Sequence, residues 1–468
     1  MKGLFIICGL GIFAMLAEIF KGFGLKKILQ PVVLLGIVVA FVLNILTEWN
    51  NPMSISYFNN MIVFDNFALA FSGVILATAF FWFVFANDYF ENSSDVTDHF
   101  ALVLFALVGA LMLTAYKNMT TLFLGIEIMS IPLYVLAASR KNDVKSNEAG
   151  FKYLILGSFA TGFLLFGIAL VYGATGSFDI MVIRAKISAA QGGLPLFFHA
   201  GVIMMLVAMC FKVAAAPFHF WTPDVYQGSP TVITAFMSTI VKTAAFTAFI
   251  RLFLVGFGGI SEKWEMVMAA IIALSLVIAN VTAVSQGSVK RMLAYSSISH
   301  AAFMLMGVLA VQPGMSIPGI LYYTLAYSVG SITAFSVLYN VSKDSGEGFE
   351  GFNGLGKRNP VMAFCMAVAM LSLAGIPVTA GFFAKYFIFA TIMATSFKWL
   401  LVLAVLTSAI GVYYYFKVII AMYFKPADKT EKVPVEMQVM LIMIITTLLT
   451  IAIGVVPGYV IDMLGNSH

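Results

Sequence analysis

The chain consists of long apolar stretches separated by short polar loops. The stretches are continuous, and most are close to the ~20 residues that an α-helix needs to cross a bilayer. Membrane-spanning strands would instead alternate between apolar and polar positions. The pattern predicts an all-α polytopic membrane protein with about fourteen transmembrane helices. Their expected ranges are 3–20, 28–46, 66–86, 101–115, 119–138, 150–172, 197–218, 229–254, 266–286, 290–311, 315–341, 360–393, 397–424 and 436–460.

The composition agrees with a membrane protein. Of the 468 residues, 61% are hydrophobic and 10% are charged, whereas a soluble protein carries about 25% charged residues. The net charge of +5 is scattered through short loops and forms no polybasic surface. Together these values exclude a soluble enzyme, a secreted disulfide-rich domain and a nucleic-acid-binding protein.

The distribution of Lys and Arg predicts the orientation of the helices. If the N-terminus lies outside the cytoplasm, the cytoplasmic loops hold most of the cations, as the positive-inside rule requires. Both termini are therefore expected on the periplasmic side of a bacterial inner membrane. The cations assigned to the cytoplasmic side are Lys21, Lys26, Lys27, Arg140, Lys141, Lys145, Lys152, Lys290, Arg291, Lys343, Lys357, Arg358, Lys417, Lys425, Lys429 and Lys432.

The residues that usually hold metals and clusters are sparse. The three cysteines, Cys8, Cys210 and Cys365, are far apart, and the five histidines lack metal-binding spacing. The sequence therefore predicts no cofactor and no metal in this chain, so that any redox chemistry belongs to a partner.

Four charged residues lie inside apolar stretches: Glu127, Lys212, Lys242 and Lys385. An isolated charge at the bilayer centre costs at least ~2.5–3.5 kcal/mol, so such residues usually face each other or water and serve a function. A Glu–Lys pair that opens and closes changes the proton affinity of both groups, which is what a proton relay requires. The alternatives are snorkelling from a helix end or a structural ion pair. Lys242 is too central for snorkelling.

Two prolines predict that the seventh and twelfth helices are discontinuous. Pro217 follows Lys212 by five residues, and Pro377 precedes Lys385 by eight. Corresponding breaks in two halves of a transporter are typical of inverted repeats around a hydrated path. We therefore expect two inverted five-helix repeats, at 101–254 and 266–424, preceded by three N-terminal helices in 1–100 and followed by a last helix at 436–460.

Polar residues between the two predicted breaks could extend the path. His300 can pass protons near neutral pH, and hydroxyl groups are supplied by Tyr322, Tyr323, Thr324 and Tyr327. Interhelical hydrogen bonding is the alternative role for these side chains.

Two motifs resemble signatures of the antiporter-like subunits of respiratory complex I. The segment 211–230, FKVAAAPFHFWTPDVYQGSP, resembles their seventh-helix signature, and 290–300, KRMLAYSSISH, resembles their tenth. The motif WTPDVYQG is similar to that of the subunit N branch of the family rather than to those of subunits L and M. The resemblance extends over essentially the whole chain, with Val232 standing where a second proline is expected.

The resemblance implies roles for the charged residues. Glu127 would pair with Lys212, Lys242 would be the central lysine, and Lys385 would lie toward the exit. The chain would be a proton-translocating membrane-arm subunit of NADH–quinone oxidoreductase. FMN and iron–sulfur clusters would lie in partner subunits, and quinone would be reduced elsewhere in the complex.

Other functions remain open from the sequence. A subunit of a multisubunit cation/proton antiporter or of a membrane-bound hydrogenase would share the fold. A solute carrier that works alone would need a substrate pocket where the helices break, and a structural scaffold would tolerate neutral replacements of all four buried charges.

Overall fold

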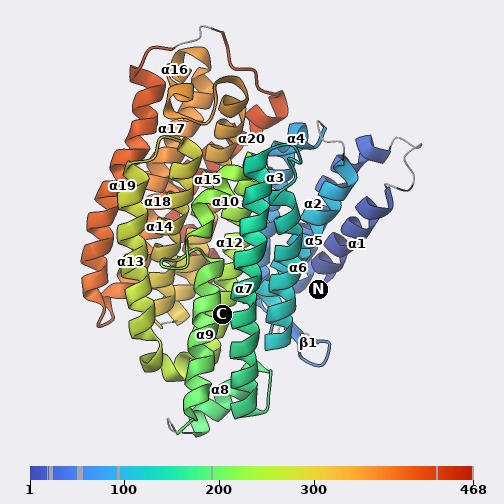
Figure 1. Cartoon of the computed structure of the whole chain (residues 1–468), viewed down its shortest axis with the longest axis vertical. Helices are drawn as coiled ribbons and strands as arrows, with labels where there is room; N and C mark the ends of the chain where they lie inside the picture. Colours follow the sequence, from blue (N-terminus) through green and yellow to red (C-terminus); the bar gives the residue numbers. More distant parts are fainter. Residues whose placement is uncertain are drawn as a thin grey trace. The chain divides into compact units, whose positions relative to one another are not determined.

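The computed structural model describes residues 1–17, 19, 25–49, 56–91, 95–190, 193–311, 313–427 and 431–465, and nearly all of its regular structure is helical (Figure 1). The chain divides into two compact units. The first unit comprises 1–213 and 240–267, and the second comprises 214–239 and 268–465. Lys21 and Lys429, two of the cations used to predict the orientation, lie outside the described residues.

The first unit is built from long helices and short connecting turns. In chain order its elements are α1 (Lys2–Ala17), α2 (Leu25–Leu43), η2 (Asn44–Glu48), β1 (Ser56–Tyr57), β2 (Ile62–Val63), α3 (Asn66–Phe85), α4 (Asn87–Glu91), α5 (Val96–Ala115), α6 (Met119–Ala137), α7 (Val144–Thr175), α8 (Ile180–Ala189), α9 (Leu196–Lys212), α12 (Lys242–Phe249), η4 (Ile250–Gly256) and η5 (Gly258–Lys263). The antiparallel β1–β2 hairpin is an addition to the expected all-helical structure and lies between two apolar helices.

The helix starts in this unit follow from capping residues in the loops. Asp65, Asn118, Asp143 and Asp179 each accept a hydrogen bond from a backbone N–H in the first turn of α3, α6, α7 and α8, respectively. These short side chains satisfy amide groups that have no partner within the helix. They therefore fix where each apolar helix begins.

Glycines allow the helices of the first unit to pack closely. A Cβ on Gly109 of α5 would lie 2.4 Å from the backbone nitrogen of Met129 in α6. A Cβ on Gly167 of α7 would lie 2.7 Å from the carbonyl oxygen of Gly201 in α9. Small residues commonly permit such close approach between membrane helices. Helices α6 and α9, which carry Glu127 and Lys212, are thereby positioned by backbone-to-backbone packing.

The second unit surrounds two deeply buried helices. Its elements are α10 (Trp221–Gly228), α11 (Thr231–Phe236), α13 (Glu265–Val284, which begins in the first unit), α14 (Val289–Leu309), α15 (Pro313–Ser345), η6 (Phe349–Phe352), α16 (Leu355–Arg358), α17 (Pro360–Ala374), α18 (Ala380–Met393), α19 (Lys398–Phe424), α20 (Met437–Val455) and α21 (Pro457–Gly465). The π-helical turn η3 (Met237–Val241) joins α11 to α12 across the boundary. In α14 and α15, 94% of the residues in the most apolar window are buried.

The helices coincide with the apolar stretches. Among the described residues, eleven helices are long and apolar enough to cross a membrane. Four shorter apolar helices are α1, α9, α17 and α18, and the last three flank the two breaks. The exact count of fourteen spans and the inverted repeats stay predictions.

Candidate functional site

Glu127 and Lys212 occupy the same region of the first unit but are not hydrogen-bonded to each other. Lys212 is the last residue of α9, and its Nζ donates to Ser130 Oγ at 2.5 Å. Ser130 in turn donates to the carbonyl oxygen of Ile126 at 2.5 Å, so its hydroxyl accepts from the lysine and donates to α6. Glu127 Oε1 is buried and has no hydrogen-bond partner among the described residues.

A small cavity adjoins the Lys212 ammonium. It has a volume of about 20 Å³ and is lined by Ser130, Tyr134, Gly157, Thr161 and Lys212, among others. That volume holds about one water molecule. A buried carboxylate oxygen without a partner is costly, so Glu127 Oε1 is free to accept a hydrogen bond from a donor that reaches it. In the described part of the chain the expected Glu127–Lys212 ion pair is not formed, and Lys212 is bound by Ser130 instead.

Lys242 lies in a helical segment with π-helical turns on both sides, η3 before α12 and η4 after it. It is 3% exposed and is the first residue of α12, directly after the π-helical turn η3. Tyr116 donates to the Ala248 carbonyl of α12 at 2.7 Å. Arg251 donates to the Thr114 carbonyl at 2.8 Å and forms an ion pair with Asp65. π-Helical turns occur frequently at functional sites.

After α9 the chain leaves the helical conformation, and a backbone amide of this break is bound by α13. Residues 213–220 are non-helical, with Ala214 in the left-handed region at φ 63°. The amide of Ala216 donates to Ser275 Oγ of α13 at 2.7 Å. Pro217 has no amide hydrogen to donate, which prevents the helix from continuing. The half-helix α10 then begins at Trp221.

Lys385 lies beside the second break. Helix α17 ends at Gly375, whose φ of 86° favours glycine, and α18 begins after Val378 and Thr379. Lys385 Nζ donates to the Ala374 carbonyl at 2.8 Å and to Ser408 Oγ at 2.7 Å. It also lies 5.0 Å above the Phe303 ring. The ammonium thus compensates a carbonyl that the break leaves without a helical partner.

His300 lies within a chain of hydroxyl groups in the second unit. Its Nδ1 is 2.7 Å from Tyr323 Oη, and its Nε2 is 3.2 Å from Tyr415 Oη. Tyr415 Oη is 2.5 Å from Ser296 Oγ. A neutral imidazole donates through one nitrogen and accepts through the other. The arrangement can therefore carry a proton from Tyr323 through His300 to Tyr415 and Ser296.

The other candidate hydroxyls have different partners. Tyr327 Oη lies 2.7 Å from Ser238 Oγ, and its ring centroid is 4.8 Å from that of His300. Tyr322 donates to the Ile453 carbonyl and Thr324 to the Leu321 carbonyl. Tyr322 thus makes an interhelical hydrogen bond, the alternative role considered for these side chains, and Thr324 makes a hydrogen bond within its own helix.

Several polar groups at these sites were not identified from the sequence. Ser130 and Ser408 bind the two lysines, and Tyr415 binds His300. Their spacing along the chain gives no signal, because they come from helices remote in sequence. Lys290 was assigned to a loop, yet its side chain is 0% exposed and is bound by Glu347 at 3.0 Å and by the Ser229 carbonyl.

Each unit thus holds its own set of buried or half-buried ionisable groups. Glu127, Lys212 and Lys242 belong to the first unit, and His300 and Lys385 belong to the second. Each set contains a lysine beside a helix break and polar groups that can exchange protons.

Known proteins share this architecture and sequence. The family described as NADH:quinone oxidoreductase/Mrp antiporter, TM, matches residues 117–411. The chain is similar to NADH-quinone oxidoreductase subunit N of Cytophaga hutchinsonii, with 42% identity over 465 residues that cover 99% of each chain. A chain of respiratory complex I from Thermus thermophilus with bound aureothin is similar at 32% identity and a TM-score of 0.85, with 99% of each chain covered.

The same fold occurs in a more distant assembly. A chain of the membrane-bound sulfane sulfur reductase, an archaeal respiratory membrane complex, has a TM-score of 0.86 at 24% identity, covering 100% of this chain and 97% of that one. This likeness concerns the fold alone.

Proposed function

The chain belongs to the NADH-quinone oxidoreductase subunit N family, an antiporter-like membrane-arm family, and from this premise we propose that it translocates protons within that complex. The observation that carries the proposal is the set of buried or half-buried ionisable groups near two helix breaks. Intramembrane charges of this kind mark ion pathways. The chain itself is proposed to bind no redox group.

The first step of the proposed mechanism is a rearrangement of Lys212. When its ammonium moves from Ser130 to Glu127, the two charges compensate each other, and when it returns to Ser130 the carboxylate is left without its partner. Either movement changes the electrostatic field inside a medium of low dielectric constant. Lys242 is proposed to take up a proton from the cytoplasmic side in one arrangement and to release it in the other.

The second step carries the proton toward Lys385. His300 with Tyr323, Tyr415 and Ser296 provides donors and acceptors at hydrogen-bond distance. In the described part of the chain, Lys385 donates its hydrogen bonds to neutral acceptors, the Ala374 carbonyl and Ser408, so loss of its proton leaves no carboxylate there uncompensated. Among the proton-carrying groups, Lys385 is therefore proposed to lie nearest the exit of the proton path.

The partner subunits and the membrane location proposed for this mechanism are those expected for the family. Electron transfer from NADH to quinone is proposed to occur in partner subunits that carry FMN and iron–sulfur clusters, and to supply the rearrangement of Lys212. The other membrane-arm subunits and the lipid bilayer are the proposed partners. The proposed location is the bacterial inner membrane, with both termini periplasmic.

The two helix breaks also support the proposed inverted repeats at 101–254 and 266–424. Each range contains one interrupted helix with a lysine within a turn or two of the break, Lys212 in the first and Lys385 in the second. Repeats of this kind place the ion path at their interface.

Purification of the tagged chain in mild detergent tests the assembly. Flavin and iron–sulfur absorbance together with NADH–quinone activity is the expected result. Iron–sulfur absorbance with hydrogenase activity and no flavin, or a colourless assembly of small membrane partners, would instead indicate a hydrogenase or a cation/proton antiporter.

Glu127→Gln is expected to lower the proton translocation rate by roughly tenfold, because the neutral amide no longer attracts the Lys212 ammonium away from Ser130. Glu127→Asp should retain most of the rate, since it keeps the charge. Proton uptake in inverted membrane vesicles, normalised to the amount of assembled complex, measures both. Equal rates for the Gln and Asp variants would contradict the role of the charge.

Tyr415→Phe is expected to slow proton translocation by roughly threefold to tenfold, because it removes the hydroxyl between His300 Nε2 and Ser296. Tyr322→Phe is the matched control, since its buried hydroxyl donates to the backbone of Ile453 and not to His300. If both variants lost activity equally in the same vesicle measurement, the chain through Tyr415 would not be a proton path.

A further inference from the structure

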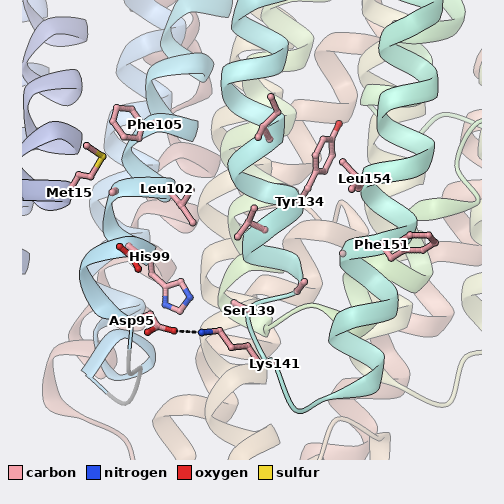
Figure 2. A pocket seen from close by; sticks show the side chains of 16 residues that line it. Met15, Asp95, His99, Leu102, Phe105, Tyr134, Ser139, Lys141, Phe151 and Leu154 are labelled. Atoms are coloured by element: carbon pink, nitrogen blue, oxygen red, sulfur yellow. Dashed lines mark hydrogen bonds and ion pairs between the residues drawn. The ribbon is translucent and has the colours of Figure 1, made fainter. Parts of the chain in front are cut away.

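The first unit contains a large cavity that the proposed proton path does not use. Its volume is about 800 Å³, and it is bounded by α1, α5, α6 and α7. Figure 2 shows Asp95, His99, Ser139 and Lys141 together at one end and Phe105 with Met15 toward the other. The cavity is thus polar at one end and apolar along its length. This lining matches the polar head and the apolar tail of an amphipathic ligand.

The polar end lies where apolar helices begin and end, which is where lipid headgroups are expected. Helix α5 begins at Val96, α6 ends at Ala137 and α7 begins at Val144, so the polar residues are at the ends of three apolar helices. The apolar walls continue into the hydrocarbon depth. Ile131 and Phe151 in these walls are 53% and 66% exposed, so the cavity opens sideways between helices rather than into the interior.

The polar end of the cavity presents both a cation and a carboxylate, which suits a headgroup that carries both charges. Lys141 Nζ is 2.7 Å from Asp95 Oδ2, and the lysine side chain stays 77% exposed, which leaves donors for a phosphate. The Asp95 carboxylate raises the pKa of Lys141 above its usual value, so this cation stays charged. Asp98 also lines the cavity, is exposed, and forms no ion pair with a cation in the described part of the chain.

We propose that this cavity binds a phospholipid with a primary-amine headgroup, of the phosphatidylethanolamine class. The lipid ammonium lies on Asp98, the phosphate accepts from Lys141, and an acyl chain lies along Phe105, Ile131 and Leu154. A choline headgroup has no N–H to donate to Asp98. An anionic glycerol headgroup places no positive charge there.

The bound acyl chain would also touch the wall of the Lys212 cavity. Tyr134 lines both the large cavity and the small one beside Lys212. It packs edge-on against Tyr153 with centroids 4.8 Å apart, and Lys212 Nζ lies 6.0 Å from the Tyr153 centroid. The lipid therefore supports the aromatic pair against which Lys212 moves.

Native mass spectrometry of the detergent-purified complex tests the proposal. The complex is delipidated and incubated with equal amounts of phosphatidylethanolamine, phosphatidylcholine and phosphatidylglycerol. We expect preferential retention of phosphatidylethanolamine, and a loss of about tenfold in its affinity in Asp98→Asn, which removes one charged hydrogen bond. Glu148→Gln, an exposed carboxylate change on α7 outside the cavity lining, should leave retention unchanged.

A second pair of variants tests the apolar walls. Ile131→Trp fills the cavity and should abolish the retained lipid, whereas Leu124→Trp, at an exposed position of the same helix outside the lining, should not. Equal retention of all three lipids, or unchanged retention in Ile131→Trp, would overturn the proposal. So would crosslinking from position 131 to a protein subunit instead of a lipid, which would make the cavity a contact with a partner helix.

Discussion

Lys242→Ala is expected to abolish proton translocation through this subunit, with a loss of at least about a hundredfold. Lys242 is 3% exposed and begins α12 directly after a π-helical turn. The proposed mechanism routes each proton through its ammonium, and alanine has no group that can hold one. Proton uptake per NADH oxidised in inverted vesicles measures the loss, while a native gel checks that the complex still assembles.

Lys242→Arg separates proton transfer from a purely electrostatic role. Arginine keeps the positive charge but stays protonated at every accessible pH, so the mechanism predicts that this variant is inactive as well. If Lys242 served only as a fixed charge, arginine would restore translocation. Thr247→Val, a buried polar change in the same helix, is the control and should retain activity. Full activity in Lys242→Ala would refute the mechanism directly.

The helices could be predicted because a continuous apolar segment that crosses a bilayer has to be helical. Every backbone amide and carbonyl must be satisfied within its own segment, which selects helices over strands. The all-α membrane fold of the antiporter-like family is confirmed by the comparisons. The β1–β2 hairpin was not expected, since it occupies a polar loop where this constraint does not apply.

The sites of the two helix breaks were also predictable, because Pro217 and Pro377 act locally. Proline removes an amide donor wherever it falls in a helix, and α9 and α17 do end shortly before these residues. The groups that satisfy the freed backbone were not predictable. Ser275 comes from a helix more than fifty residues away in sequence.

The hydrogen-bond and ion-pair partners of the intramembrane charges depend on how the helices pack in three dimensions. A single sequence does not reveal that packing. The resemblance to the antiporter-like subunits implied an ion pair between Glu127 and Lys212. The structure instead places Lys212 on Ser130, one turn along α6 from Glu127. A serine in a membrane helix is common and carries no pattern of its own.

Gly381→Ala is expected to destabilise the second unit by about 2–3 kcal/mol, through overpacking at the start of α18. A Cβ at Gly381 would lie 1.8 Å from the carbonyl oxygen of Ser372 in α17, which is backbone and cannot rotate away. The Gly381 amide also donates to Ser372 Oγ at 3.1 Å. Helix α18 must therefore shift away from α17.

The same shift should reach Lys385, which lies one turn further along α18. Its Nζ would move relative to Ala374 and Ser408, to which it now donates at 2.8 and 2.7 Å, so proton translocation should fall together with thermal stability. Differential scanning fluorimetry in detergent and proton uptake in vesicles measure the two effects. Gly458→Ala is the control, because a Cβ there meets no atom within 4 Å. If both alanine variants melted at the same temperature, α18 would not depend on the glycine contact, and the position of Lys385 would have to be fixed by its hydrogen bonds alone.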